Sequence, residues 1–166
     1  LGKRSPIQMD SPFPIYPTDR GGLETYHGPG QWVLFPVFRL QRGVKEFFHK
    51  ALEGTLEFVK VFDPKAKVEE GERVGIWLTE GLKVASMGVR IRDHVVQHGL
   101  SLNVYPTQES FRGINPCGIK GAQAGFLLRE LETPERLKEK FEVIGRQWVQ
   151  SVSRSLFGKP AKEIST

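Results

Sequence analysis

Cysteine is nearly absent from this sequence, which contains only one, Cys117. A single cysteine cannot build an internal disulfide framework or a metal site with several thiolate ligands. Long apolar runs are missing too, and none approaches the roughly 18 residues that a helix needs to span a membrane. The basic residues are dispersed and lack the dense blocks and interleaved aromatics that are typical of a nucleic-acid surface. These absences exclude a disulfide-stapled fold and a helical membrane protein.

The composition that remains is that of a globular protein, with 39% hydrophobic and 26% charged residues over 166 positions. This length and balance predict a single domain over residues 1–166 with a hydrophobic core of its own. The formal net charge is +5, which favours an acidic partner. An acidic carrier protein fits this charge as well as a nucleic acid does, so the charge alone leaves both open.

The first part of the chain combines an irregular segment with two periodic ones. Residues 1–17 contain four prolines and no hydrophobic period, so we expect an irregular lead-in. Apolar and aromatic residues over 32–40 predict a buried strand that is interrupted at Pro36. Helical spacing from about Gly43 predicts an amphipathic helix whose apolar stripe consists of Val44, Phe47, Phe48, Ala51, Leu52, Thr55 and Val59.

The middle of the chain favours strands. Charge, Pro64 and Gly71 predict an exposed connection over residues 62–73. Strands are then expected over 75–78, 83–92 and 100–104. The last two would form an antiparallel pair, joined by a turn over residues 93–99.

A second helix is predicted near the end, with Thr133 as its N-cap and Pro134 at its first position. Gly158 and Pro160 would stop this helix, and residues 158–166 would form a frayed tail. Its expected buried stripe consists of Leu137, Phe141, Ile144, Trp148, Val152 and Leu156. Together the elements predict an α+β fold, a mixed α/β sandwich with a central mixed or antiparallel sheet flanked by helices.

The segment "DRGGLETYHGPGQ", residues 19–31, contains five glycine and proline residues and must therefore be a loop. Glycine lets the backbone approach a ligand closely, and Pro29 stiffens the exit from the loop. One interpretation is a long surface turn with incidental polar residues. The other is a backbone cradle for a ligand, with Arg20 and His27 presented by rigid flanks.

Cys117 lies in "INPCGIKG", and a lone cysteine is more often a small buried hydrophobe than a nucleophile. A Pro-Cys-Gly turn, however, exposes a thiol together with backbone N–H groups. A reactive thiol also needs a nearby base or cation. The four histidines, His27, His49, His94 and His98, allow a Cys–His protease, but no spacing favours one.

Lys83 is a further candidate because it begins the largely apolar segment "KVASMGVRIR". Lysine is usually solvated. Here the small neighbours Ala85, Ser86 and Gly88 would leave a cavity beside it.

The segments "RGGLETYHGPGQ", "GIWL", "LKVASMGVRI", "HGLSLNV" and "FRGINPCGI" resemble, in order and spacing, the motifs of the lipoyl(octanoyl) transferases. The resemblance extends from about Arg20 to Gly121. It implies the fold shared with biotin and lipoate ligases. It also implies an enzyme that moves an octanoyl group from acyl carrier protein, through a cysteine thioester, to a lysine of a lipoyl domain in lipoate biosynthesis.

The resemblance also implies roles for individual residues. Cys117 would accept the acyl group, and Lys83 would be its partner, as an ammonium that stabilises the thiolate and as an amine that takes a proton. The backbone N–H groups of Cys117 and Gly118 would be the oxyanion donors. No metal or cofactor is implied. The acyl site would consist of Arg20, Gly21, Gly22, Leu23, Glu24, Thr25, Tyr26, His27, Ser86, Met87, Gly88, Gly99, Leu100 and Ser101.

The implied partners are octanoyl-acyl carrier protein as donor and, as acceptor, the lipoyl domains of 2-oxoacid dehydrogenase complexes or the glycine cleavage H protein. Neither nucleic acid nor a membrane is implied, and the expected location is the cytoplasm, or the mitochondrion in a eukaryote. Two departures stand out. Residues 124–127 are Ala-Gly-Phe-Leu where family members usually carry Val-Thr-Ser-Leu. Residues 1–4 resemble the end of an N-terminal segment that this chain is expected to lack.

Two alternatives stay open. An ATP-dependent lipoate or biotin-type ligase of the same fold is one, although "HGPG" replaces the His-Asp segment of a ligase and no nucleotide-phosphate motif is evident. The other is a non-catalytic module that binds an acyl group or nucleic acid.

Overall fold

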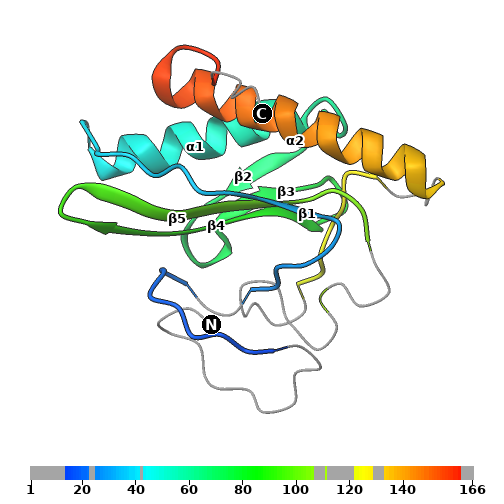
Figure 1. Cartoon of the computed structure of the whole chain (residues 1–166), viewed down its shortest axis with the longest axis horizontal. Helices are drawn as coiled ribbons and strands as arrows, with labels where there is room; N and C mark the ends of the chain where they lie inside the picture. The colour runs from blue at the N-terminus through cyan, green and yellow to red at the C-terminus, as the bar shows by residue number, and fades with distance from the viewer. Residues whose placement is uncertain are drawn as a thin grey trace.

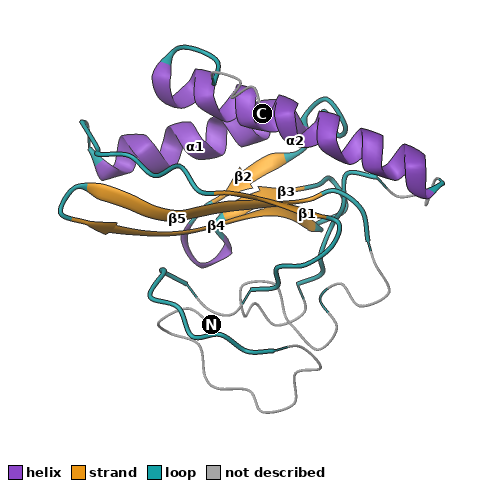
Figure 2. Cartoon of the chain, in the orientation of Figure 1, coloured by secondary structure: helices purple, strands orange, loops and turns teal. Residues whose placement is uncertain are grey.

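The computed structural model describes residues 14–22, 25–41, 43–106, 111, 122–128 and 133–161. Its centre is a five-stranded antiparallel sheet in the order β1-β5-β4-β3-β2. Two helices lie side by side on one face of the sheet, and the described parts of residues 14–30 lie on the other (Figures 1 and 2). We call the first the helix face and the second the loop face. The predicted α+β class is confirmed, with both helices on the same face.

The elements follow one another as strand, helix, four strands and helix, with one short 3-10 turn between β2 and β3. Among the described residues, no helix is both long enough and apolar enough to cross a membrane. The bounds are β1 Gln31–Leu34, α1 Val44–Val59, β2 Lys67–Glu69, η1 Gly71–Arg73, β3 Gly75–Trp77, β4 Lys83–Arg92, β5 Val95–Asn103 and α2 Pro134–Phe157.

Helix α1 begins, and helix α2 begins and ends, where their local signals predict. Gly43 is the N-cap of α1, and Thr133 is the N-cap of α2. Gly158 follows α2 with φ 69°, a left-handed conformation that glycine adopts without strain. Most residues of the predicted stripes face the core. Val44 is 48% exposed at the first turn of α1, and Leu137 near the start of α2 is only half-buried.

The hairpin between β4 and β5 is tighter than the sequence predicts. Arg92 pairs with Val95, so the turn is Asp93–His94 and not residues 93–99. Both turn residues have positive φ, 50° and 62°, which suits the right-handed twist of the flanking strands. The expectation placed Gly99 in the turn, whereas it lies inside β5 opposite Gly88.

Two further expectations hold only in part. The strand predicted over 32–40 is interrupted near Pro36 as expected, because β1 ends at Leu34 and the backbone pairs with β5 again at Arg39. The interrupting stretch is not buried, since Phe35 and Val37 are 57% and 67% exposed. Pro36 lacks the N–H that a continuing ladder would need. The connection predicted over 62–73 contains strand β2, because its short polar segment pairs with β3 at the sheet edge.

Candidate active site

Four small residues of the predicted acyl site meet on the loop face. Ser86 pairs with Ser101, and Gly88 pairs with Gly99, on the adjacent strands β4 and β5. Directly opposed residues share a face of the sheet, and side chains alternate between faces along each strand. Met87 and Leu100 therefore point the other way, and both belong to the hydrophobic core.

A shift in strand register puts Lys83 on this same loop face. Gly75 pairs with Ser86, but Trp77 pairs with Lys83, so β4 carries one more residue than β3 over this stretch. Such a bulge reverses the alternation of side chains on one strand. Without it, Lys83 would share a face with Ala85 and point into the helix-covered core.

Lys83 is buried, with 1% of its surface exposed. Its Nζ donates a hydrogen bond to the carbonyl oxygen of Val74 at 2.7 Å. The same nitrogen lies 5.5 Å from the centroid of the Trp77 ring, within reach of a cation–π attraction. A buried amine needs such partners because water does not hydrate it there.

Arg20 lies over the small pairs on the loop face. It is 9% exposed, and a Cβ added at Gly88 would be 3.2 Å from its Cδ and Nη1 atoms. Next to it, the backbone N–H of Gly21 donates to the carbonyl oxygen of Val89 at 3.1 Å. The start of the glycine-rich loop is thus hydrogen-bonded to β4 and forms an ordered part of the loop face.

The segment that follows the Pro-Cys-Gly turn in sequence is joined to Lys83 by its backbone. The Lys83 N–H donates to the Gln123 carbonyl at 2.9 Å, and the Gly125 N–H donates to the Lys83 carbonyl at 2.8 Å. Gly125 fits closely, because a Cβ there would lie 2.9 Å from Cβ of Leu82. The chain carries glycine at position 125, where family members usually have threonine, and in this structure a larger residue there would collide with Leu82.

An aromatic cluster holds the neighbouring chain together. The ring of Phe126, the other departing residue, lies 6.3 Å from that of Phe111. Phe111 in turn lies 5.1 Å from the ring of Tyr26 in the glycine-rich loop. The segments that carry Tyr26, Phe111 and Phe126, of which the first is far from the other two in the sequence, therefore meet at this point.

Gln31 and Asn103, which are not among the predicted site residues, connect His27 to this arrangement. The Nδ1 atom of His27 lies 2.6 Å from Oε1 of Gln31, and Gln31 Nε2 donates to Oδ1 of Asn103 at 2.8 Å. Asn103 Nδ2 donates to the carbonyl oxygens of Lys83 and Gly125 at 3.3 and 3.0 Å. Gln31 ends the motif "RGGLETYHGPGQ", and Asn103 lies in "HGLSLNV". Only the pairing of β1 with β5, which places these two residues opposite each other, reveals that their side chains are connected.

The electrostatics of the loop face centre on Arg20. His27 retains solvent exposure, yet partial desolvation of its ring lowers its pKa, and the charge of Arg20 acts in the same direction. Burial likewise lowers the pKa of His98, followed by the charges of Arg20 and Arg90. Asp19 accepts contacts from both Arg90 and His98. The histidines therefore favour their neutral forms.

Some predicted site residues lie outside the described residues, namely Cys117, Gly118, Leu23 and Glu24. Gly22 and Thr25 are described and flank the last two of these in the loop. Of the other candidate histidines, His49 is exposed on α1 and His94 is exposed in the hairpin turn.

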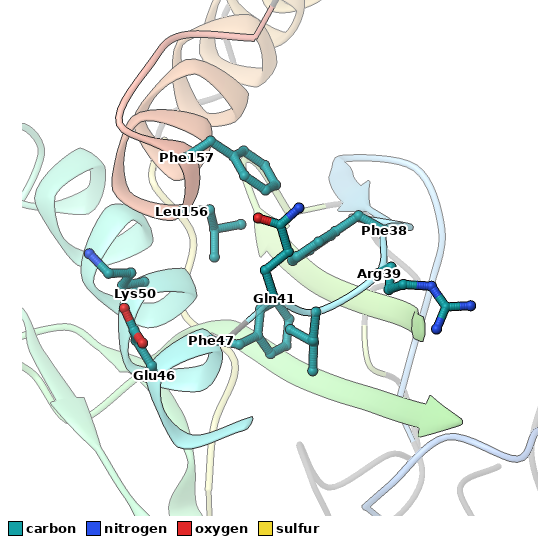
Figure 3. A pocket seen from close by; sticks show the side chains of 9 residues that line it. Phe38, Arg39, Gln41, Glu46, Phe47, Lys50, Leu156 and Phe157 are labelled. Atoms are coloured by element: carbon teal, nitrogen blue, oxygen red, sulfur yellow. The ribbon is translucent and has the colours of Figure 1, made fainter. Parts of the chain in front are cut away.

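A pocket of about 400 Å³ lies away from the loop face (Figure 3). It is formed by the first turns of α1, the last turn of α2 and residues 38–41. Of the predicted site residues that the structure describes, none lines it. Its lining includes Phe38, Arg39, Phe47, Lys50, Leu156 and Phe157.

Comparison with known proteins places these features in a family. The model of the lipoyl protein ligase A/B catalytic domain matches residues 9–147. An octanoyltransferase of Shewanella piezotolerans is 35% identical over 158 residues, which cover 93% of this chain and 69% of the relative. One of Pseudomonas putida is 38% identical over 141 residues, or 83% of this chain and 64% of the relative.

An octanoyltransferase of Wolbachia pipientis is 36% identical over 116 residues, or 66% of this chain and 56% of the relative. The chain thus spans between 56% and 69% of the length of these three curated relatives. The family model covers most of the chain, including the loop face, helix α1 and the first part of helix α2. The chain belongs to the lipoyl protein ligase A/B catalytic domain family.

Proposed function

We propose that this chain carries out octanoyl transfer, from acyl carrier protein to a lysine of a lipoyl domain, through a thioester on Cys117. The observation that carries the proposal is Lys83, buried on the loop face beside the paired serines Ser86 and Ser101. A buried amine beside small side chains is costly for stability and suited to chemistry. The octanoyltransferase relatives support the reaction class.

The reaction has two steps. The thiolate of Cys117 attacks the carbonyl carbon of the donor thioester, and the carrier thiol leaves with a proton. The amine of the acceptor lysine then attacks the new thioester, so that a C–N bond forms, the C–S bond breaks and Cys117 is regenerated. The Cys117 thioester has roughly the same free energy of hydrolysis as the carrier thioester from which it forms. Its conversion to an amide is downhill, so the cycle needs no ATP.

Lys83 would stabilise the thiolate of Cys117 in both steps. Its positive charge stabilises a thiolate both as the attacking group and as the leaving group. Two features support the pairing of Lys83 with Cys117. Five residues separate Cys117 from Gln123 in the sequence, and Gln123 binds the Lys83 backbone.

The flanks of this segment give the second support. Phe111 precedes Cys117 and Phe126 follows it, and their rings lie 6.3 Å apart. The segments that flank Cys117 in the sequence therefore approach each other beside Tyr26 of the glycine-rich loop. This contact supports a role of Cys117 at the loop face.

The small pairs on β4 and β5 would provide room for the acyl chain. Burial of each methylene contributes about 0.8 kcal/mol, so an octanoyl chain can bind through its apolar surface alone. Arg20 and the glycines beside it, together with Thr25, Tyr26 and His27, would form the wall opposite the strands. The acyl-site roles of Leu23, Glu24, Met87 and Leu100 remain part of the proposal, the last two through their backbone.

The deciding experiment is intact-mass measurement of the protein after mixing with octanoyl-carrier protein, followed by addition of a lipoyl domain. We expect one octanoyl group on the protein and its subsequent transfer to the domain. A parallel reaction contains free octanoate and ATP in place of the carrier. Transfer only with ATP would replace the proposal by a ligase of the same fold, and no transfer in either reaction would favour a binding module.

A further inference from the structure

The hydrogen bonds from His27 to Asn103 have a single consistent direction. Asn103 faces two backbone carbonyl oxygens, those of Lys83 and Gly125, on one side of its amide. A carbonyl oxygen can only accept, so the NH₂ group of Asn103 must face them. The amide oxygen of Asn103 must consequently face Gln31.

The same reasoning orients the next two groups. Oδ1 of Asn103 accepts, so the partner that Gln31 presents to it must be its NH₂ group, at 2.8 Å. The oxygen of Gln31 then faces Nδ1 of His27 at 2.6 Å. Because that oxygen accepts, Nδ1 of His27 must carry a proton. A neutral ring has one N–H, and so its Nε2 holds a lone pair.

The surroundings favour the neutral ring. Partial desolvation is the main reason that the pKa of His27 is lowered, while the hydrogen bond to Gln31 acts in the opposite direction. Arg20 is the charged residue within the described part of the chain that lowers it further. His27 is exposed, whereas Lys83 is buried. His27 is therefore accessible from solvent, and Lys83 is not.

We propose that Gln31 and Asn103 are positioning residues, which hold the exposed His27 as its Nδ1–H tautomer so that Nε2 takes the proton from the attacking lysine of the acceptor. This inference rests on the proposed function. When the amine attacks the Cys117 thioester, its nitrogen becomes positively charged and acidic. Nε2 accepts that proton, the C–S bond breaks to give the thiolate, and the imidazolium then releases its proton to water.

Asn103 also connects the His27 ring to the backbone around Lys83. Its amide binds the backbone of Lys83 and of Gly125 at once. The strand that presents Lys83, the segment after Cys117 and the loop that carries His27 are therefore joined through the side chains of Asn103 and Gln31. A single group in this position keeps the base and the buried amine in a fixed relation.

The tautomer is measured directly in the free protein by NMR of the histidine ring nitrogens. In the wild type we expect His27 to show a protonated Nδ1 and a lone pair on Nε2. Methionine has a length similar to that of glutamine but cannot form the hydrogen bond between His27 Nδ1 and the side-chain oxygen. Gln31→Met should therefore give a mixture of His27 tautomers. Gln97→Met on β5 is the matched control and should leave the His27 signals unchanged. An unchanged tautomer in Gln31→Met would overturn the positioning role.

The catalytic consequence is measured on protein already carrying the octanoyl group. Transfer to the lipoyl domain should slow roughly a hundredfold in His27→Gln and about tenfold in Gln31→Met. His49→Gln, an exposed histidine on α1, is the control. Wild-type transfer rates in His27→Gln would overturn the base role. If the wild type takes up no octanoyl group, the proposed function fails and the base role with it, while the tautomer measurement still decides the positioning role.

Discussion

The Nζ atom of Lys83 and the carbonyl oxygen of Val74 are joined by a 2.7 Å hydrogen bond at a site where the lysine is 1% exposed. Removing an ammonium group from water costs several kcal/mol, which the partners of a buried charge often do not repay in full. The fold therefore keeps Lys83 in a position that lowers stability. Such positions are common where a side chain serves chemistry.

Replacing Lys83 with methionine should separate these two roles. Methionine has a similar length and no charge, so we expect the free energy of unfolding to stay unchanged or rise. Octanoyl uptake should fall at least about a hundredfold, because the thiolate loses its cation. Thermal unfolding and intact mass test both points. Uptake at the wild-type rate in a folded Lys83→Met protein would remove Lys83 from the mechanism.

Lys83→Arg addresses whether a fixed positive charge suffices. Arginine remains protonated and cannot take a proton during the cycle. If Lys83 acts only as a cation, self-acylation and transfer should both survive in this variant. Loss of transfer alone would instead assign the proton step to Lys83 and not to His27. The two half-reactions are followed by the mass of the enzyme and of the lipoyl domain.

Cys117→Ser should abolish the covalent intermediate and leave the fold intact. A hydroxyl is far less acidic than a thiol, so the serine does not form an anion near neutral pH. Intact mass should show no octanoyl group on the variant, and circular dichroism should match the wild type. Formation of octanoyl-amide at the parent rate would show that transfer does not pass through Cys117.

Gly54→Ala tests the contact between the helices. Alanine gains about 1 kcal/mol in helix propensity over glycine. A Cβ at Gly54, however, would lie 2.8 Å from Cα of Val152 on α2 and 2.9 Å from the Ser151 carbonyl oxygen. Because backbone atoms cannot move aside easily, overpacking should cost about 1–3 kcal/mol. This cost should exceed the propensity gain, so the free energy of unfolding should fall by up to about 2 kcal/mol. Thermal unfolding measures the loss, and exposed Glu57→Ala on the same helix should change stability little.

Arg20 should control the titration of two histidines. Its charge contributes to the lowered pKa of both His27 and His98. Arg20→Gln should therefore raise both pKa values, as measured by NMR titration. Arg39→Gln, which removes an exposed arginine bonded to the Asp93 carbonyl, is the control. Unchanged histidine titrations in Arg20→Gln would contradict the expected coupling.

The lowered pKa values also fix the direction of pH-dependent stability. A histidine whose pKa is lower in the folded state binds its proton first in the unfolded chain. Acid therefore favours unfolding as the pH falls below the ordinary value of 6.5, and this contribution is absent at higher pH. Denaturant unfolding from pH 7.5 to 5 should show the wild type losing more stability than Arg20→Gln.

Local signals in the sequence were sufficient for several elements. The spacing of apolar residues predicts both helices, and Gly43, Thr133 and Gly158 mark ends that the structure confirms. Strand β4 has the predicted bounds, Lys83–Arg92. These features depend on residues within a few positions of one another, so propensity and capping decide them.

Pairing between distant strands decided the rest. Strand β2 is short and polar, and only its pairing with β3 makes it a strand. The motifs of the sequence indicated the family and drew attention to Lys83, but the face on which Lys83 lies follows from one extra residue in β4. Gln31 and Asn103 are separated by 72 positions. Sequence by itself determined the helices and the chemistry-bearing residue types, whereas tertiary structure alone decided which side chains share a face, because strand register and bulges arise from contacts that no local pattern contains.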